Sequence, residues 1–586
     1  MKSYDVIIVG AGMAGLRSAI GCVKHDLRTA LITKVHPLRS HSVGASGGIN
    51  AVLDNRIFRM ENNTVLRDSQ ELHFNDTLEC GYHFSDADAV ETLVSRAPVM
   101  IRELERWGCL FSREEDGSFA LRRMSGGRFA RTLYASDKTG RAIMNTLYEQ
   151  CVRLRQNKPD QLRIFEEWIV LKLLVLNNTV AGVVAMDIAS GKLETIYAKT
   201  VIWATGGSGR IYGRTSNPGT NSGWGMAIPY YAGASLKDME FVQFHPTQAW
   251  DSKILISEAA RGEGGILINR KEERFLAVYE DSRTEKEFSG QDVISRNIRR
   301  EILAGRGVEA KYVYLDLRNI KEKKIQERMP GVRELCKTFL DIDPQKELIP
   351  VAPGQHYTIG GVHTNENTET DINGFFAAGE CACAGVHGAN RMGGNSLMET
   401  LVFADRAAEY AARYIQRKNT KIPKEIFFEQ ALSREEERIR DLLSAKGDIH
   451  VSEIRKRLNE TMDTYAGIFR DGMGLVEAAK TIKELMQLYH SRLEVYGDSA
   501  RANFGLIEAL ELRGSLDIAD IIVQTALKRN ESIGVHFRND FPAAPNRLRH
   551  SLCKLRKGKP FIRHIPVRSK TKPVKPLHVL APWIRK

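Results

Sequence analysis

Residues 4–15 read YDVIIVGAGMAG, and this stretch decides the fold. Its apolar first half predicts a short buried strand, and the apolar periodicity that follows predicts a helix. Between them, Gly10 allows a tight turn, Gly12 lets the backbone approach a pyrophosphate, and Gly15 lets helix and strand pack closely. A second apolar strand is predicted for residues 29–33. This order of strand, glycine turn, helix and strand is typical of a dinucleotide-binding domain.

The residues beyond the second strand indicate which dinucleotide is bound. The acidic residue that usually closes this strand is missing, because Thr33 and Lys34 stand there, and this argues against NAD. A further strand and small-residue turn, TVIWATGG at 200–207, favours FAD in a two-segment domain. A third glycine-rich block, residues 374–399, contains GFFAAGE and is expected to return to the same cofactor.

These segments predict an α/β protein built on an interrupted Rossmann-like FAD-binding domain. We expect its two parts at 1–239 and 351–420, with an inserted α+β capping domain at 240–350. Apolar residues at three- and four-residue spacing predict a helical domain of antiparallel helices at 421–530. Residues 531–586 are expected to form a C-terminal basic domain or tail.

Composition narrows the class of protein. A chain of 586 residues can bury several cores without disulfide or metal staples. No apolar run approaches the roughly 18–20 residues of a membrane helix, and the N-terminus enters a strand without a signal segment. The eight cysteines are scattered with no C-x-x-C pair, so we expect a reduced compartment and neither a metal nor an iron–sulfur site in this chain. Any clusters would then belong to another subunit.

The positive charge is concentrated at the C-terminal end. The net charge is +13, and residues 541–586 hold thirteen Lys or Arg with no Asp or Glu. Such a tail can meet an anionic membrane, an acidic partner or nucleic acid, or can be a solvated extension. Nucleic acid is disfavoured because the tail has few aromatic residues to stack on bases. We expect a docking element outside the catalytic core, which deletion after about residue 555 would remove without loss of cofactor.

The stretch KVHPLRSHSVGASGGIN at 34–50 strongly resembles the flavoprotein subunit of succinate dehydrogenase and fumarate reductase. In that family R-S-H-[ST] carries a histidine bonded covalently to the 8α-methyl group of FAD, and this histidine matches His41. The resemblance covers almost the whole chain, in order. It continues through DMEFVQFHPT (238–247), SEAARGEGG (257–265), PGQHYTIGGV (353–362), GFFAAGE (374–380), HGANRMGGNSL (387–397) and ESIGVHFRNDFP (531–542).

The resemblance implies a set of cofactor contacts. Glu380 is expected near the flavin or its ribityl chain, and Ser396 and Leu397 near the isoalloxazine ring. Together with the glycine turn and the loop that carries His41, the implied FAD-binding residues are Gly10, Ala11, Gly12, Met13, Ala14, Gly15, Thr33, Lys34, Ser40, His41, Ser42, Gly47, Gly48, Glu380, Ser396 and Leu397.

The resemblance also implies a site for a dicarboxylate. Succinate and fumarate are dianions, and Arg391 matches the arginine that binds one carboxylate, which a guanidinium can do bidentately. His245 and His356 match two histidines that hydrogen-bond the other carboxylate, and Ser257 stands where the family has Thr or Ser. Donors placed in this way face the negative charge that develops during the reaction.

Proton transfer is where the sequence departs from the family. Glu258 and Arg261 match an acid–arginine pair that relays the proton to solvent. The family arginine that delivers this proton to substrate is replaced by Gln291, although Arg296 of the same motif is present. An amide can hydrogen-bond a carboxylate but is neither acid nor base. Arg283, in the preceding loop, is a candidate substitute.

A second departure is Trp224, which replaces an aspartate of the family's T-G-D-G segment near FAD. The resemblance implies the flavin subunit of a respiratory succinate or fumarate oxidoreductase, peripheral on the cytoplasmic face of a bacterial or archaeal inner membrane. Electrons would pass through an iron–sulfur subunit, and a membrane anchor would exchange them with quinone. L-Aspartate oxidase shares the architecture but lacks the flavin-linking histidine. Another dicarboxylate oxidoreductase, or a flavinylated subunit with impaired catalysis, stays open because of Gln291.

Overall fold

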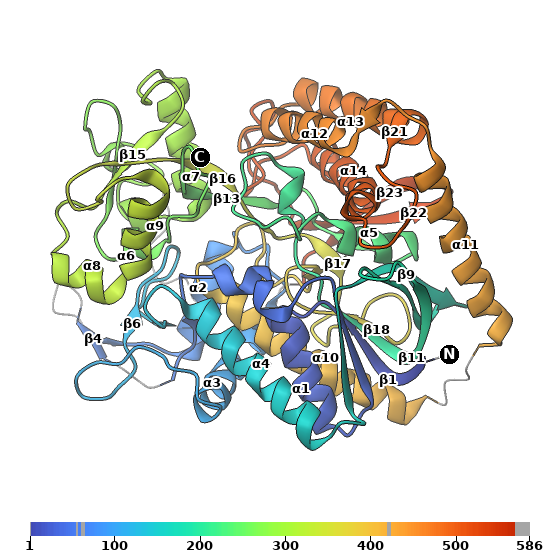
Figure 1. Ribbon diagram of the computed structural model, residues 1–586. Coiled ribbons are helices and arrows are strands. Elements are labelled where there is room, and N and C mark those ends of the chain that lie inside the picture. Colours follow the sequence, from blue (N-terminus) through green and yellow to red (C-terminus); the bar gives the residue numbers. More distant parts are fainter. Residues whose placement is uncertain (1, 54–56, 60–64, 419–422, 569–586) are drawn as a thin grey trace.

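The computed structural model describes residues 2–53, 57–59, 65–418 and 423–568. It is an α/β structure with a central sheet, a capping body and a helical body (Figure 1). Residues from all three parts line one pocket. This confirms the predicted fold class.

The central sheet is Rossmann-like. Its strand order is β8-β2-β1-β11-β10-β9, and β18 pairs with β11. Strands β8, β2, β1 and β11 run parallel to one another, and β18 runs parallel to β11. Strands β10 and β9 form an antiparallel extension of the sheet. The bounds are β1 Lys2–Val9, β2 Thr29–Thr33, β8 Leu162–Glu166, β9 Trp168–Leu176, β10 Thr179–Asp187, β11 Leu193–Trp203 and β18 Phe375–Ala377.

Helices gather on one face of this sheet (Figure 1). The helix that follows the glycine turn, α1, packs against α10, and a Cβ at Gly21 would lie 2.6 Å from Ala408 Cβ, so glycine permits this close approach. The bounds are α1 Met13–Lys24, α2 Gln70–Cys80, α3 Ala87–Arg106, α4 Thr139–Asn157 and α10 Asn395–Arg417. Short strands in the same region are β3 Ile49–Asn50, β4 Ile57–Arg59, β5 Val65–Arg67, β6 Leu121–Arg122 and β7 Thr132–Leu133.

The capping body is a four-stranded antiparallel sheet, β13-β16-β15-β14, with short helices around it. Strand β16 continues to Thr358, so the sheet crosses the boundary expected at residue 350. Strands β13 and β16 run from the cap towards the pocket. The bounds are β13 Val242–Ala249, α6 Ala259–Gly262, β14 Ile266–Ile268, α7 Gln291–Leu303, β15 Val313–Asp316, α8 Glu322–Arg328, α9 Pro330–Leu340 and β16 Ile349–Thr358.

The helical body consists of α12, α13 and α14, which pack on one another, while α11 packs on strands β10 and β11 of the central sheet. Helix α14 also packs on α5 of the nucleotide-binding domain. Among the described residues, no helix is both long and apolar enough to cross a membrane. The bounds are α5 Trp224–Tyr231, α11 Glu425–Ser444, β20 Ile449–His450, α12 Val451–Tyr465, α13 Gly472–Arg492, β21 Leu493–Glu494 and α14 Phe504–Lys528.

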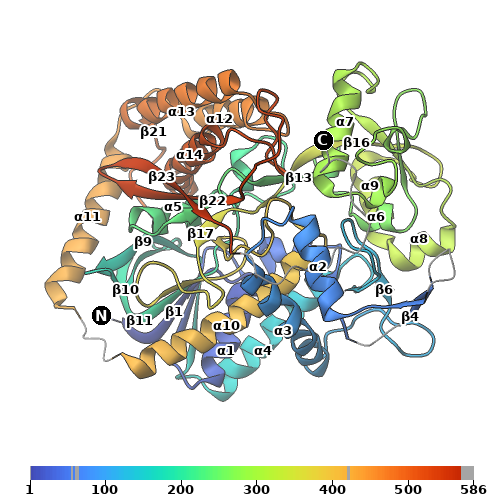
Figure 2. The same cartoon turned by 180° about the vertical axis from the view of Figure 1, so that it is seen from behind.

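The first half of the basic C-terminal segment is folded and is not the solvated extension that was one alternative for it. It forms a hairpin of β22 and β23 that extends the sheet β19-β17-β12-β22-β23, and Figure 2 shows it in red beside β17. His550 and Cys553 of β22 are buried, so this half belongs to the folded body. The rest of the tail, from residue 569, lies outside the described residues. The bounds are β12 Leu236–Lys237, β17 Gly361–His363, β19 Ala382–Cys383, β22 Arg549–Arg556 and β23 Lys559–Pro566.

Two truncations separate the hairpin from the segment beyond it. A chain that ends after Arg568 should melt at the same temperature as the full chain, because the hairpin is intact. A chain that ends after Arg556 should melt several degrees lower, because β23 pairs with β22 along its whole length and contributes the buried side chain of Ile562. Thermal unfolding of the two truncated chains measures this, and equal melting temperatures would contradict the structural role of the hairpin.

Candidate active site

The glycine turn has the geometry that a bound pyrophosphate requires. Gly10 has φ +98°, and a Cβ there would lie 2.2 Å from the carbonyl oxygen of Ala204 on β11. A Cβ at Gly15 would lie 1.8 Å from the Gly10 oxygen, so helix and turn are in backbone contact. Gly12 precedes α1 without a side chain to cap it. The Met13 N–H donates to Ser42 Oγ at 3.2 Å. Gly12, Met13 and Ala14 line the pocket, so the N-terminus of α1 faces it and favours an anion there.

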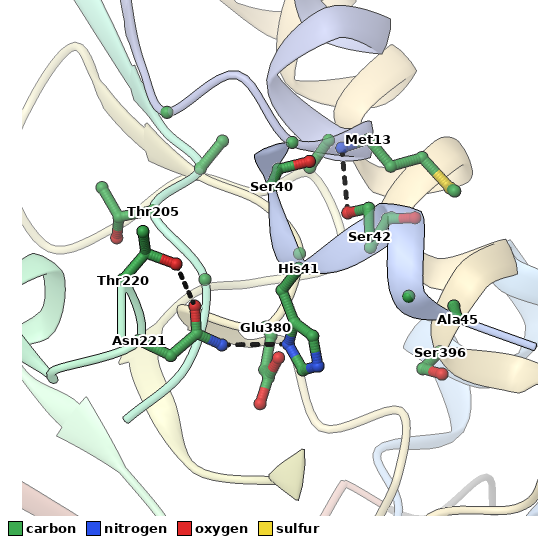
Figure 3. A pocket seen from close by; sticks show the side chains of 18 of the residues that line it. Met13, Ser40, His41, Ser42, Ala45, Thr205, Thr220, Asn221, Glu380 and Ser396 are labelled. Atoms are coloured by element: carbon green, nitrogen blue, oxygen red, sulfur yellow. Dashed lines mark hydrogen bonds between the residues drawn. The ribbon is translucent and has the colours of Figure 1, made fainter. Parts of the chain in front are cut away.

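One pocket is lined by residues of this turn and of the cap. Figure 3 shows the part of it around His41. Gly15 is not among its lining residues, because it contacts the turn. The expected cofactor residues that do line it are Gly10, Ala11, Gly12, Met13, Ala14, Thr33, Lys34, Ser40, His41, Ser42, Gly47, Gly48, Glu380, Ser396 and Leu397. The expected substrate residues that line it are His245, Ser257, Glu258, His356 and Arg391, together with Gln291.

His41 begins a short 3₁₀ helix, His41–Gly44, at the wall of the pocket. The Asn221 side-chain amide donates to its Nδ1 at 3.0 Å (Figure 3). Burial lowers the pKa of His41 to about 4, so the ring is neutral near pH 7. Because Nδ1 accepts the hydrogen bond, the ring hydrogen is on Nε2. The ring is thus fixed by one partner and carries no charge.

Glu380 lies in the same part of the pocket (Figure 3). The backbone N–H of Thr358 donates to its Oε1 at 3.0 Å. Burial raises the pKa of Glu380 to about 7, since the charged carboxylate loses its hydration. This carboxyl group is therefore divided between its charged and neutral forms near neutral pH.

The raised pKa predicts a pH-dependent stability of the flavin-free protein. A group whose pKa is higher in the folded state stabilises it below the unfolded pKa and loses that contribution as the pH rises through the folded pKa. The free energy of unfolding should therefore fall from about pH 5 to about pH 8 by on the order of 3 kcal/mol more in the wild type than in Glu380→Gln. Melting curves of both proteins across this range test it. Parallel pH dependences would show that the Glu380 pKa is not raised.

The substrate end of the pocket holds a fixed guanidinium. Arg391 is buried, its Nε donates to the Gln243 side-chain oxygen at 2.9 Å, and its Nη1 donates to Ser396 Oγ at 3.2 Å. The group also lies over the ring of Tyr357, at 5.0 Å. These contacts orient a permanent positive charge in the pocket, and a planar guanidinium suits a carboxylate.

Two neutral imidazoles lie beside this charge. The rings of His245 and His356 are 4.9 Å apart, and Ser216 Oγ is 2.8 Å from His356 Nδ1. Burial lowers the pKa of both histidines well below its usual range, and the neighbouring Arg391 charge lowers it further. Each ring can therefore donate one hydrogen bond to an anion without itself being charged.

The expected proton relay is only partly assembled. Glu258 Oε1 accepts from the Ser125 N–H at 2.6 Å, and its Oε2 accepts from the Gln291 side-chain amide at 2.8 Å. Arg261 is fully buried but does not line the pocket, and its Nη1 donates to Thr247 Oγ1 at 2.8 Å. Its Nε and Nη2 have no hydrogen-bond partner among the described residues. Burial lowers the Arg261 pKa, and Glu258 opposes this.

The other candidate arginines lie elsewhere. Arg283 has an exposed side chain and is not among the residues that line the pocket. Arg296 turns away to an ion pair with Asp292 and a 2.7 Å hydrogen bond to the Gly534 oxygen. Among the described arginines, Arg391 is thus the one that lines the pocket, as Gln291 also does.

Trp224 fills the position where the resemblance implies an aspartate. Its indole Nε1 donates to the Val170 oxygen at 3.0 Å, and a Cβ at Gly514 of α14 would lie 2.8 Å from its ring. The side chain is therefore packed between β9 and α14 at the wall of the pocket.

Several contacts escaped the sequence analysis. Gln243 orients Arg391, Ser216 contacts His356, and Asn221 contacts His41. Gln243 lies inside a quoted motif, DMEFVQFHPT, two residues before His245, so strand alternation could have indicated it. Ser216 and Asn221 lie in a polar loop, and a loop carries no periodicity from which such a contact could be predicted.

The fold and the site define a flavoprotein oxidoreductase. The FAD binding domain family matches residues 5–397, and the fumarate reductase flavoprotein C-terminal family matches residues 455–578. The chain is 40% identical over 554 residues to the fumarate reductase flavoprotein subunit of Mycobacterium tuberculosis, with 92% of each chain covered. It is 38% identical over 587 residues to the succinate dehydrogenase flavoprotein subunit of Rickettsia conorii, covering 96% of this chain and 95% of the relative.

The structural comparison agrees with these relatives. A mutant of the flavoprotein FrdA of E. coli quinol fumarate reductase superimposes with a TM-score of 0.91 at 36% identity, covering 98% of both chains. The chain therefore belongs to the family of fumarate reductase and succinate dehydrogenase flavoprotein subunits. It is an FAD-dependent oxidoreductase of this family, and the resemblance found in the sequence is confirmed.

Proposed function

We propose that this chain interconverts succinate and fumarate as the flavoprotein subunit of a respiratory complex. The observation that carries the proposal is the grouping of the Arg391 guanidinium with the neutral rings of His245 and His356 in the pocket that His41 also lines. A fixed cation and two neutral donors suit a dianion with a carboxylate at each end. The relatives favour this function over that of L-aspartate oxidase.

Each residue at the substrate end has a defined task. Arg391 binds one carboxylate, held in orientation by Gln243 and Ser396. His245 and His356 donate hydrogen bonds to the other carboxylate. Burial of these groups strengthens every charge interaction, because water is excluded. When bound, FAD supplies the acceptor for the hydride of succinate.

The proposed reaction also needs a proton transfer at the second substrate carbon, and the residue expected to deliver that proton is replaced in this chain. Glu258 can hold a proton, and Arg261 lies behind it in the cap. The Gln291 amide donates to Glu258 but cannot carry a proton itself. This observation supports a second candidate function, that of a flavinylated subunit that binds dicarboxylates and turns them over slowly.

The remaining assignments concern the assembly. An iron–sulfur subunit would pass electrons to or from the flavin, and membrane anchor subunits would exchange them with quinone. The chain would then sit peripherally on the cytoplasmic face of the inner membrane. Complexes of this kind are named among the structural relatives, which include quinol fumarate reductases.

Covalent attachment of FAD through His41 is part of the proposal. Wild-type protein precipitated in acid should keep its flavin, and a denaturing gel should show flavin fluorescence at the position of the chain. His41→Ala should still bind FAD, because the glycine turn and Glu380 remain. It should lose succinate oxidation before fumarate reduction, because only oxidation needs the raised flavin potential that the covalent bond gives the family. Release of all flavin from acid-precipitated wild type would overturn the attachment.

The direct test of the activity is reoxidation of the chemically reduced flavin by fumarate, without oxygen. We expect the oxidised flavin spectrum to return on addition of fumarate. It should not return on addition of oxaloacetate with ammonia, which condense to iminosuccinate, the oxidation product of aspartate. Flavin that stays reduced with fumarate in both the wild type and Gln291→Arg would exclude the proposed function.

A further inference from the structure

The strand that normally supplies a ribose-binding carboxylate lacks one in this chain. In dinucleotide-binding domains an acidic residue near the end of the second strand hydrogen-bonds the ribose hydroxyls. Here β2 ends at Thr33 and is followed by Lys34. The Lys34 ammonium forms an ion pair with Glu511 of α14, a residue 477 positions further along the chain. A carboxylate thus lies at the end of β2 after all, but it comes from the helical body.

Glu511 faces the cofactor pocket. Its side chain is 8% exposed, and it lines the same pocket as the glycine turn. Its Oε1 accepts from Lys34, and among the described residues no donor reaches its Oε2. This oxygen can therefore accept a hydrogen bond from a ligand in the pocket.

The other two described acidic residues that line the pocket have different hydrogen-bond partners and do not lie at the end of β2. Glu380 bonds to Thr358, and Glu258 bonds to Ser125 and Gln291 beside the substrate residues. Trp224, which packs against Gly514 of α14, donates its single polar hydrogen to Val170 and offers no acceptor. Among the described acidic residues that line the pocket, Glu511 is therefore the one placed at the end of β2.

The position of α14 is fixed by two contacts on the same face as Glu511. Ser515 Oγ donates to the Ser222 oxygen at 2.7 Å, one helical turn after Glu511. Gly514 lies against Trp224, where a Cβ would meet the ring at 2.8 Å. Residues three and four apart share a helix face, so these contacts keep the face of α14 that carries Glu511 turned towards the pocket.

We infer that Glu511 accepts hydrogen bonds from the ribose hydroxyls of the adenosine half of FAD, with Lys34 holding its carboxylate in place. The helical body thereby contributes a cofactor-binding residue to a site that is otherwise built by the nucleotide-binding domain. The inference rests on FAD binding and is independent of the proposed substrate.

The test measures FAD affinity by flavin fluorescence in a His41→Ala background, where the cofactor is free to dissociate. Two ligands are compared: FAD, and an FAD analogue whose adenosine is 2′,3′-dideoxy. The background protein should bind FAD about tenfold or more tightly than the analogue, since a hydrogen bond to a charged acceptor is worth about that factor. Adding Glu511→Gln should weaken FAD binding by a similar factor and remove most of the preference.

Glu508→Gln is the matched control, because Glu508 is exposed on the same helix and its one ion pair among the described residues is with Arg455, at 3.7 Å. It should leave both affinities unchanged. A background protein that binds FAD and the analogue equally would overturn the inference, even if Glu511→Gln failed to fold. So would a Glu511→Gln protein that binds FAD less tightly but keeps its full preference, because its role would then be structural. Succinate or fumarate turnover does not enter either readout.

Discussion

Gln291→Arg should raise the turnover of succinate and fumarate by about 10²–10⁴-fold, the usual contribution of a positioned acid–base group. The Gln291 amide already lies 2.8 Å from Glu258 Oε2, so a guanidinium at this position would pair with that carboxylate. The affinity for dicarboxylate should change far less, because Arg391, His245 and His356 are untouched. An effect on kcat without a matching effect on KM marks a group that acts in the transition state.

Gln291→Met is the control, because it keeps the volume but cannot contact Glu258 or carry a proton. Its turnover should stay at or below that of the wild type. If the wild type already turns over rapidly and Gln291→Arg changes nothing, another group supplies the proton. Arg261 would then be the first residue to replace, because it is buried in the cap beside Glu258 whereas Arg283 is exposed.

Arg391→Gln should weaken dicarboxylate binding by about 10²-fold or more, because it removes a charge-assisted, bidentate contact from a buried site. Flavin content should be unchanged, since the residues around His41 and the glycine turn remain. The shift of the flavin spectrum on titration with malonate, a dicarboxylate that cannot be oxidised in this way, measures the affinity.

Arg283→Gln provides the control for charge removal at an exposed site, and its affinity should equal that of the wild type. Loss of affinity in both variants would point to long-range charge rather than a contact. Unchanged affinity in Arg391→Gln would place the substrate elsewhere in the pocket.

The sequence predicted what depends on local pattern. The glycine turn of residues 10–15 and the strands around it form as expected, because turn and periodicity are short-range signals. The resemblance located His41, Glu258, Gln291 and Arg391, all of which line one pocket in the structure.

Long-range pairing could not be predicted in this way. The ion pair of Lys34 with Glu511 joins residues 477 apart, and neither neighbourhood indicates the other. Strand β22 was read as part of a basic tail because of its charges. In the structure β22 pairs with β12, some three hundred residues earlier in the chain. The many Lys and Arg residues of this segment made its strand pattern of buried and exposed side chains hard to recognise from the sequence.

The central claim is that a dicarboxylate bound by Arg391 reduces the flavin of this chain. The measurement that tests it most directly is the absorbance of the oxidised flavin after addition of succinate to purified protein without oxygen. We predict that the absorbance bleaches slowly in the wild type, faster in Gln291→Arg, and not at all at the same succinate concentration in Arg391→Gln. Flavin that stays oxidised in both the wild type and Gln291→Arg would contradict the claim.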